Sequence, residues 1–217
     1  MKKLFTLAIA LVFMTGMAFA QDNDASITQV GDEAEATITQ IGEENEASIE
    51  QFNANDDFNA SILQEGIDNS ASVTQDDGNF KESTVEQIGD RNSADVTAEG
   101  GGRADASDVF QTGNDNVASM NLNLITTAFG EITQTGNDNE ADIIANDGNT
   151  AIVMQEGDDN FAEINSGFFS PGGVLTIDQF GNENFGVIDQ DGAGANNDAS
   201  IHQDGNNNNA TITQDNL

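Results

Sequence analysis

The stretch Gln40-Ile41-Gly42-Glu43-Glu44-Asn45-Glu46-Ala47 decides the fold, because its order of residue types, Q-x-G-x-x-N, returns along the whole chain. Eight copies are complete in all three residues. They are Gln40-Gly42-Asn45, Gln64-Gly66-Asn69, Gln87-Gly89-Asn92, Gln111-Gly113-Asn116, Gln134-Gly136-Asn139, Gln155-Gly157-Asn160, Gln179-Gly181-Asn184 and Gln203-Gly205-Asn208. A period of this length is typical of repeat architectures such as solenoids.

Short segments that alternate apolar and polar residues flank each copy. Ala36-Thr37-Ile38-Thr39 leads into the first copy, and Ala47-Ser48-Ile49-Glu50 leaves it. Alignment on the aliphatic residue gives seventeen such units, and this residue is apolar in all of them. A period of two places the small, aliphatic and glutamine side chains on one face of a β-strand. A helix is not expected, because no apolar stripe recurs every three to four residues.

The spacing between units pairs them into coils. From Ile38 onward, the step across Q-x-G-x-x-N is always eleven residues, whereas the step to the next copy varies from ten to thirteen. Glycine, asparagine or aspartate, which tolerate positive φ, stands four residues after the aliphatic residue in fifteen of the seventeen units. We therefore predict an all-β protein, a β-solenoid with cross-β-like stacking. Each two-strand coil of about 22–24 residues would contain a fixed turn and a variable turn.

The predicted organisation has three parts. Residues 1–20 are expected to be a secretory signal peptide, with a basic start at Lys2 and Lys3, an apolar run, and a cleavage signal at residues 18–20. Residues 21–35 form an N-terminal segment with one unpaired half-repeat, and residues 36–217 form a solenoid of eight coils. The last unit, residues 210–214, has no recognisable cap after it, so we expect an open strand edge there.

Charge and composition exclude several classes of partner. Beyond residue 20, 39 acidic residues stand against three bases (Lys81, Arg91 and Arg103), which gives a formal net charge of −36. We therefore expect no nucleic-acid partner, and no later segment is apolar enough for membrane insertion. Low hydrophobicity with high charge would by itself indicate disorder, but stacked repeats can pool small apolar faces into one core.

No residue pattern indicates an enzyme, a metal site or a cofactor. His202 is the only histidine and falls at an outward strand position, and the chain has no cysteine. Catalytic thiols and His/Cys metal clusters are therefore not expected. A calcium-binding β-roll needs a nine-residue repeat, which the period here does not match. Loose binding of divalent cations by stacked outward acids stays open.

Stacking gives the repeated residues physical roles. Coils about 4.8 Å apart place identical positions above one another, so Gln40 and its equivalents can hydrogen-bond from amide to amide. Gly42 and its equivalents are expected to bend the chain, and Asn45 and its equivalents to tie the bend. The second arm of each coil has glutamine in only four coils. We expect its ladder to be interrupted at Ala98, Leu122, Ala145 and Ser166.

The pattern Q-x-G-x-x-N-x-A-x-x-x-Q resembles the curlin repeat of curli, the functional amyloid fibres of bacterial biofilms. It is complete at Gln40, Gly42, Asn45, Ala47 and Gln51, and again in the copies that begin at Gln64 and Gln203. The resemblance implies a secreted structural subunit that assembles with itself into fibres at the surface of a Gram-negative cell, for adhesion and biofilm matrix. It also implies a related curlin subunit and an outer-membrane export channel as partners.

Several features depart from the usual curlin pattern. The position six residues before the glutamine is usually serine but here holds residues such as Ala34, Phe58, Lys81 and Asp105, and the N-terminal segment is short. Whether the chain is a major subunit or a nucleator, and how it is exported, therefore stays open. The alternative function is a monomeric secreted acidic β-solenoid that binds calcium or a surface ligand.

Overall fold

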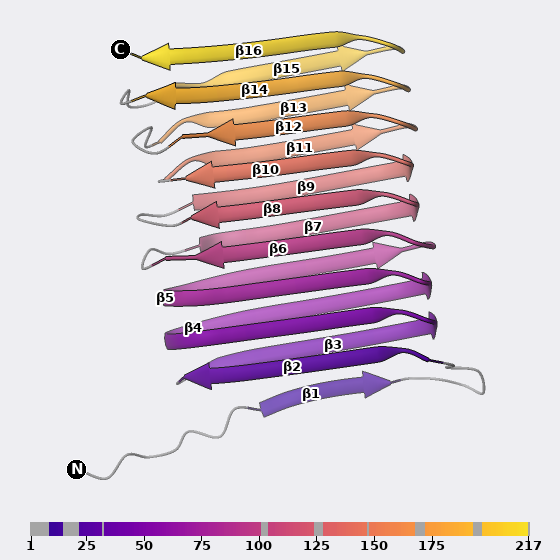
Figure 1. The fold of residues 1–217 in the computed structure, drawn as a ribbon, viewed down its shortest axis with the longest axis vertical. Coiled ribbons are helices and arrows are strands. Elements are labelled where there is room, and N and C mark those ends of the chain that lie inside the picture. The colour runs from indigo at the N-terminus through magenta and orange to yellow at the C-terminus, as the bar shows by residue number, and fades with distance from the viewer. Residues whose placement is uncertain are drawn as a thin grey trace.

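The computed structural model describes residues 9–14, 22–31, 33–100, 104–123, 128–146, 148–167, 172–192 and 197–216. Over these residues the chain forms strands and turns and contains no helix. The strands stack parallel to one another into a rod with β1 at one end and β16 at the other (Figure 1). This arrangement confirms the predicted all-β β-solenoid.

The strands follow the repeat along the chain. Their bounds are β1 (Ile9–Met14), β2 (Asp24–Gly31), β3 (Ala34–Glu43), β4 (Glu46–Ile67), β5 (Ser70–Ile88), β6 (Ser93–Glu99), β7 (Ala104–Asn114), β8 (Val117–Asn123), β9 (Ala128–Asn137), β10 (Glu140–Asn146), β11 (Thr150–Glu156), β12 (Phe161–Ser166), β13 (Val174–Phe180), β14 (Phe185–Gly192), β15 (Ala199–Asp204) and β16 (Asn209–Asn216).

The strands form two faces of the rod, which we call the first and the second sheet. The first sheet contains β3, residues 58–67 of β4, residues 81–88 of β5, and then β7, β9, β11, β13 and β15. The second sheet contains β2, residues 46–52 of β4, residues 70–76 of β5, and then β6, β8, β10, β12, β14 and β16. β4 and β5 pass from one sheet to the other through bends at positive φ, such as Asn53 and Asp77.

Pairing is parallel and keeps equivalent repeat positions opposite each other. Ile38 lies opposite Ile62, and Gln40 lies opposite Gln64. The fixed turns line one side of the rod and the variable turns line the other (Figure 1). A constant eleven-residue step allows every fixed turn to stack on the next, whereas the variable turns absorb the differences in coil length.

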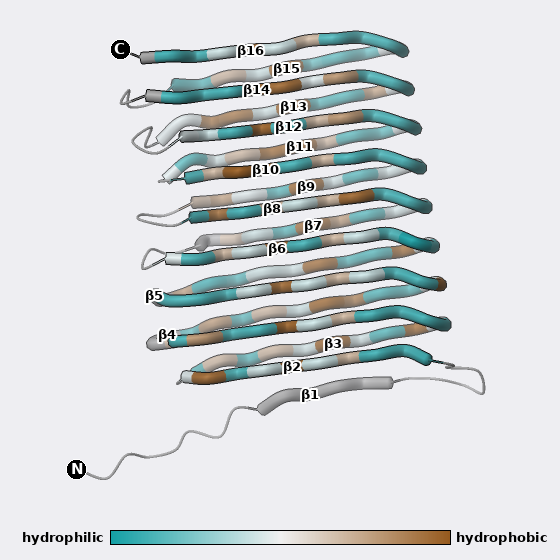
Figure 2. Tube along the Cα trace, viewed as in Figure 1, coloured by the Kyte–Doolittle hydropathy of each residue, from teal (hydrophilic) through white to brown (hydrophobic). Residues whose placement is uncertain are grey.

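The core lies between the two sheets and consists of narrow columns. Small, aliphatic and glutamine positions are buried, and the positions between them face outward, as the alternation along β3 shows. Ile49, Val73 and Val96 are fully buried. Complete burial of such a side chain stabilises the fold by about 1.5–3 kcal/mol. Hydrophobic positions recur in the middle of the strands, and most residues at the fixed turns are hydrophilic (Figure 2).

Met120 is the one aliphatic-column residue that is not β-branched, and the opposite sheet explains it. The small position facing it is Gly130, where an added Cβ would lie 2.6 Å from Met120 Sδ. Leu122 Cδ2 lies 3.2 Å from the same point. The longer side chains on β8 therefore fill the space that a glycine leaves on β9.

Part of the predicted signal peptide is ordered in the uncleaved chain. β1 pairs in parallel with β3 and places Val12 opposite Ile38. The cleavage signal at residues 18–20, Lys2, Lys3 and Arg103 lie outside the described residues, so removal of residues 1–20 stays a prediction. No helix that could span a membrane occurs in the part of the chain that the structure describes.

Candidate assembly site: the ladders and the rod ends

The eight repeat glutamines form one continuous line of hydrogen bonds inside the first sheet. Gln40 Nε2 donates to Gln64 Oε1 at 2.9 Å, and the same contact recurs at 2.8–3.0 Å in each of the seven steps to Gln203. All eight side chains are at most 5% exposed. A buried amide without a partner would destabilise the fold by about 1–3 kcal/mol. The continuous line therefore makes glutamine tolerable at a core position.

Each of these glutamines also ties the two sheets together. Nε2 of Gln40 donates to Asp24 O at 2.9 Å, and Nε2 of Gln64 donates to Glu46 O at 2.9 Å. An equivalent bond to the start of a second-sheet strand occurs at all eight glutamines. One Nε2 proton thus bonds to the next glutamine along the rod, and the other bonds to the backbone of the opposite sheet.

The first-sheet ladder has a direction, so its two ends differ. Nε2 always donates to the Oε1 of the next coil toward the C-terminus. At the N-terminal end, Gln40 Oε1 is buried and has no hydrogen-bond partner among the described residues. At the other end, Gln203 Nε2 bonds to Phe185 O at 3.0 Å, and no further glutamine follows it in the described first sheet. The ladder therefore ends in an unused acceptor beside β1 at one end and in an unused donor at the other.

The second sheet carries only fragments of such a ladder. Gln29 donates to Gln51 at 2.7 Å and Gln51 to Gln75 at 2.8 Å. The line returns only at Gln190, which donates to Gln214 at 3.2 Å. The buried residues between these fragments are Ala98, Leu122, Ala145 and Ser166. The second-sheet ladder is therefore interrupted at the four positions that were predicted from the sequence.

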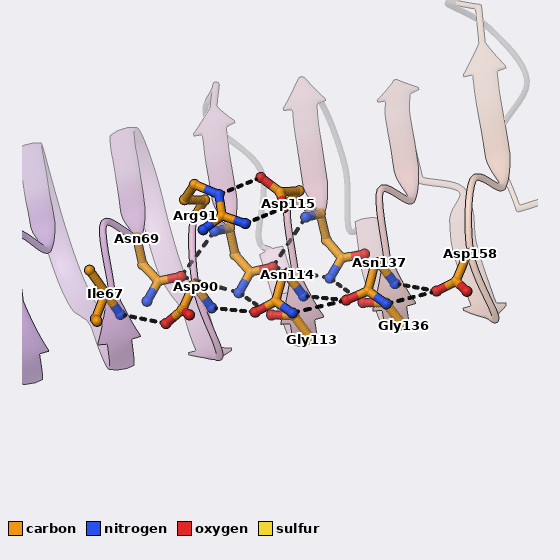
Figure 3. Close-up of polar contacts among 12 residues, drawn as sticks. Ile67, Asn69, Asp90, Arg91, Gly113, Asn114, Asp115, Gly136, Asn137 and Asp158 are labelled. Atoms are coloured by element: carbon orange, nitrogen blue, oxygen red, sulfur yellow. Dashed lines mark hydrogen bonds and ion pairs between the residues drawn. The ribbon is translucent and has the colours of Figure 1, made fainter.

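The asparagines of the fixed turns form a second continuous line. Asn45 Oδ1 accepts from both N and Nδ2 of Asn69, at 3.1 and 3.0 Å, and Asn45 Nδ2 donates to Gly66 O at 2.9 Å. The contacts to Oδ1 repeat at every step as far as Asn208 (part of the line is drawn in Figure 3). These side chains hold each turn to the turns on both sides.

Asn23 is a ninth member of this line, and the sequence interpretation missed it. Its Oδ1 accepts from Asn45 N at 2.9 Å, and its Nδ2 donates to Gly42 O at 2.9 Å. The signal was present, since Asn23, Ala25, Ile27 and Gln29 keep the spacing of a complete second arm. It was overlooked because no complete Q-x-G precedes this asparagine.

An outer line of side chains runs beside the asparagine line, and the repeat pattern did not reveal it (Figure 3). Asp90 Oδ1 accepts from Ile67 N at 3.0 Å, and Asn114 Oδ1 accepts from Asp90 N at 3.0 Å. The line continues through Asn137, Asp158, Asn182 and Asn206. Here the acceptor belongs to the following coil, whereas in the inner line it belongs to the preceding coil.

The fixed turn bends at two residues rather than one. Gly42 has φ 122°, as predicted for the glycine, but Glu44 also has a positive φ, 56°. The equivalents of Glu44, all with φ between 55° and 59°, are Asp68, Arg91, Asp115, Asp138, Asp159, Glu183 and Asn207. Asp and Asn tolerate this conformation better than most residues and fill five of the eight positions. That preference was the signal for the second bend.

Glycine at the first bend is needed for space as well as for φ. A Cβ added to Gly42 would lie 1.9 Å from Gly66 O in the next coil. The same clash, at 1.9–2.3 Å, occurs at each fixed-turn glycine as far as Gly181. At Gly205 the nearest atom would be Asn208 Nδ2 at 3.6 Å, because no coil lies above it among the described residues. Gly205 is therefore the one fixed-turn glycine at which an added Cβ meets no backbone atom of another coil among the described residues.

The few bases have defined surroundings. Arg91 binds Asp115 of the next turn through two hydrogen bonds, Nε to Oδ1 at 2.8 Å and Nη2 to Oδ2 at 2.6 Å (Figure 3). This pairing lowers the pKa of Asp115 and raises the pKa of Arg91. Both groups are exposed, so the pair contributes little to stability.

Lys81 is buried beside a variable turn. Its side chain is 1% exposed, and Nζ donates to the carbonyl oxygens of Asp76 at 2.6 Å, Ala98 at 2.9 Å and Gly100 at 3.0 Å. Nζ also lies 5.6 Å from the ring centroid of Phe58. Burial lowers the pKa of Lys81 to about 8, although nearby acids oppose the shift.

Outward acids do not form the unbroken columns that stacking suggested. In the second sheet, Glu50 lies between Thr28 and Thr74 of the neighbouring coils. Acids meet mainly as pairs, such as Asp142 opposite Glu163. No group of three or more His, Cys, Asp or Glu residues that could hold a metal ion occurs in the described ranges. Neutral residues between acids therefore dilute repulsion along the rod.

Asp108 is a partly buried acid with acidic neighbours. It lies opposite Glu131 in the first sheet. Burial raises the pKa of Asp108, and the charges of Glu82 and Glu131 raise it further, against a hydrogen bond with Thr84 that lowers it.

His202 is exposed at its outward position, with Nδ1 3.9 Å from Asp178 Oδ2. Its exposure agrees with the outward position predicted for it.

Comparison with known proteins bears on three stretches of the chain. The family model described as curlin associated repeat matches residues 20–52, 175–201 and 194–216. No curated protein and no solved structure matches the chain. The matched stretches contain the first and the last of the Q-x-G-x-x-N turns, and the turns between them have the same geometry. These stretches at the two ends of the chain are therefore similar to the curlin associated repeat.

Proposed function

We propose that this chain is a curli-type structural subunit that assembles with copies of itself, end to end, into fibres of cross-β structure. One observation carries the proposal: the polar ladders run through the whole rod and stop at ends with opposite, unused hydrogen-bonding groups. Gln40 Oε1 needs a donor, and Gln203 Nε2 has no glutamine acceptor among the described residues. A second copy whose β15 edge meets the β3 edge supplies each end with the group that it lacks.

The open strand edges support the same proposal. The outer edges of β15 and β16 pair with no other strand in the described part of the chain. Uncovered edges are templates for pairing with another chain. The parallel, in-register stacking of equivalent positions inside the rod can continue unchanged across a junction between copies.

The similarity to the curlin repeat suggests the biological setting. We propose that residues 1–20 are removed on secretion and that the chain leaves the cell through an outer-membrane channel. It would then form extracellular fibres with a related curlin subunit on a Gram-negative cell. Fibres of this kind would serve adhesion and the biofilm matrix. Curlin-repeat proteins are structural rather than enzymatic, which agrees with the absence of catalytic patterns in this sequence.

Incubation of the purified chain from Gln21 tests the proposal. We expect fibres that bind thioflavin and give a reflection near about 4.8 Å along the fibre axis, which is the strand spacing of stacked coils. A chain that stays monomeric with the circular dichroism of β structure, under neutral and acidic conditions alike, would refute it. That outcome would favour the secreted monomeric solenoid instead.

A further inference from the structure

The two sheets differ in their numbers of strands. Beyond residue 20, the described first sheet contains eight strands, and the described second sheet contains nine. The extra strand is β2, which pairs with residues 46–54 of β4 at the N-terminal end of the rod. In the uncleaved chain, β1 fills the first-sheet position beside β3. Once residues 1–20 are removed, β3 has an open edge in the first sheet. The second sheet then extends one strand, β2, beyond the first sheet at this end.

Simple end-to-end stacking of cleaved chains leaves a gap. If β2 of one copy stacks on β16 of another, one first-sheet position between β15 and β3 stays unfilled. Gln203 Nε2 and Gln40 Oε1 are then about two strand spacings apart, roughly 9.6 Å, which is too far for a hydrogen bond. Gln40 Oε1, which has no hydrogen-bond partner in the full chain, gains no glutamine donor in such a stack.

β2 and β16 carry nearly the same sequence. Residues 23–29 read N-D-A-S-I-T-Q, and residues 208–214 read N-N-A-T-I-T-Q. Five of the seven residues are identical, and these include every residue that faces the core or the turn. Residues 208–214 can therefore make against β4 the contacts that residues 23–29 make now.

The hydrogen-bonding side chains of residues 23–29 have equivalents in residues 208–214. Asn23 Oδ1 accepts from Asn45 N at 2.9 Å, and Asn208 has the same group with no donor recorded for it in the described chain. Gln29 Nε2 donates to Gln51 Oε1 at 2.7 Å, and Gln214 can replace it. The one charged difference favours the exchange, because Asp24 lies opposite the acid Glu46, whereas β16 would place neutral Asn209 there.

We propose that β2 is an exchangeable strand: it covers the edge of β4 in the free subunit and is displaced by β16 of the preceding copy when fibres grow. This inference rests on the proposed end-to-end assembly and specifies its junction. The exchange keeps the second-sheet contacts made by residues 23–29 and adds the pairing of β15 with β3 in the first sheet. Gln203 Nε2 then reaches Gln40 Oε1, and both ladders continue between copies.

The exchange also regulates assembly. Before a partner arrives, the second-sheet edge at the N-terminal end is occupied by the subunit's own strand. Growth then requires β2 to leave as β16 of the other copy enters. Displaced residues 22–31 would lie outside the fibre core. Fibre growth is therefore slower than it would be with a free β4 edge.

A reversible disulfide tests whether β2 must leave. Ser26 lies opposite Ser48 across β2 and β4, and neighbouring parallel strands are close enough for a disulfide. The chain has no other cysteine. In the double variant Ser26→Cys/Ser48→Cys, built in the chain from Gln21, we expect oxidised monomers to fail to elongate wild-type seeds and reduced monomers to elongate them.

The matched control locks two strands that are never exchanged. Ser48 lies opposite Ser72 across β4 and β5, so Ser48→Cys/Ser72→Cys carries the same kind of link one coil further along. We expect oxidised and reduced forms of this control to elongate seeds equally. Equal elongation by oxidised and reduced Ser26→Cys/Ser48→Cys protein would overturn the exchange and leave fibre formation itself intact. Absence of fibres from all forms, wild type included, would count against the proposed function instead.

Cross-linking within fibres identifies the strand that pairs with β16. Fibres grown from mixed Thr211→Cys and Ser48→Cys chains should form disulfide-linked dimers, since Thr211 occupies the position of Ser26 against Ser48. Fibres from mixed Thr211→Cys and Ser26→Cys chains should not. The opposite result, links through position 26 and none through position 48, would show that β2 stays in place at the junction.

Discussion

At the scale of single residues, the structure explains why amides stand in a core that otherwise holds alanine and aliphatic side chains. Each repeat glutamine in the interior of the first sheet uses its Oε1 and both amide protons. Asn69 and its equivalents do the same in the turns. These amide side chains are stable in the core only as members of a complete line, because each one supplies the hydrogen-bond partner of the next.

Replacement of one interior glutamine tests this dependence. Gln111→Ala leaves Gln87 Nε2 without its acceptor and Gln134 Oε1 without its donor. Gln75→Ala, the matched control in the interrupted ladder, leaves only one glutamine, Gln51, without its ladder partner. We expect Gln111→Ala to lower the free energy of unfolding of the monomer by about 1–3 kcal/mol more than Gln75→Ala. Equal losses in urea denaturation would remove the case for a privileged first-sheet ladder.

Lys81 gives the stability an unusual dependence on pH. Its folded-state pKa is about 8, below the ordinary value of 10.5 that applies to the unfolded chain. The unfolded state therefore binds more protons between about pH 8 and 10.5, so stability rises with pH in this window, by at most about 1.4 kcal/mol per pH unit. The chain has no tyrosine or cysteine that would titrate there.

The control for this prediction is Lys81→Met, which keeps an unbranched side chain and removes the amine. We expect denaturation of the chain from Gln21 to show a rise in stability from pH 8 to 10 in the wild type and a smaller rise, or none, in the variant. The N-terminal amine is common to both. Parallel curves for the two proteins would mean that the Lys81 amine is not buried.

At the scale of elements, the sequence predicted the strands well and the turns only in part. The period of two placed the buried faces correctly, and the constant step of eleven residues located the fixed turns. The bend at Glu44 and its equivalents was missed because glutamate and arginine hide the preference for left-handed conformation that aspartate and asparagine reveal elsewhere. The outer line through Asp90 and Asn114 was missed because its two residue types alternate without a fixed letter.

Two alanine substitutions separate the folding of a fixed turn from its stacking. Gly113→Ala places a Cβ 1.9 Å from Gly136 O inside the rod, so we expect the monomer to lose its β circular dichroism or most of its stability. Gly205→Ala meets no atom closer than 3.6 Å, so we expect a folded monomer that loses only about 1–3 kcal/mol to backbone strain. The strain arises because residue 205 has φ 106°.

The same two variants, Gly113→Ala and Gly205→Ala, distinguish a turn at the end of the rod from a turn in its interior. In a fibre, the next copy brings the carbonyl oxygen of its Gly42 to the place of the new Cβ at position 205. We therefore expect Gly205→Ala monomers to be folded but unable to support continued growth of wild-type seeds, measured by seeded thioflavin kinetics. Growth at the wild-type rate would mean that no coil stacks on Gly205.

At the scale of the whole molecule, the proposed junctions between rods use the same contacts as the interior of the rod. The solenoid could be predicted from sequence because eight identical spacings leave little choice of register. The proposed exchange of β2 could not be predicted from sequence. The unequal numbers of strands in the two sheets, which allow residues 208–214 to replace residues 23–29, are seen only in the structure. The buried Lys81 could not either, since a base beside Asp76 and Asp77 suggests a solvated ion pair.

Net charge sets the conditions for assembly. Two chains that each carry a formal charge of −36 beyond residue 20 repel one another over distances of about the Debye length, roughly 8 Å in physiological salt. We expect fibre growth to accelerate when acid protonates the carboxylates, when salt is raised, or when divalent cations are added. Thioflavin kinetics that respond to none of these changes would contradict electrostatic control.

Mass per length of single protofilaments tests the central claim most directly, that folded rods join end to end. With eight first-sheet strands per chain and about 4.8 Å per strand, each chain should extend a protofilament by roughly 38 Å. Scanning transmission electron microscopy of unstained fibres measures this quantity. One chain per roughly 38 Å is the predicted result. One chain per about 4.8 Å, as in fibres where each chain lies flat in a single layer, would contradict the account.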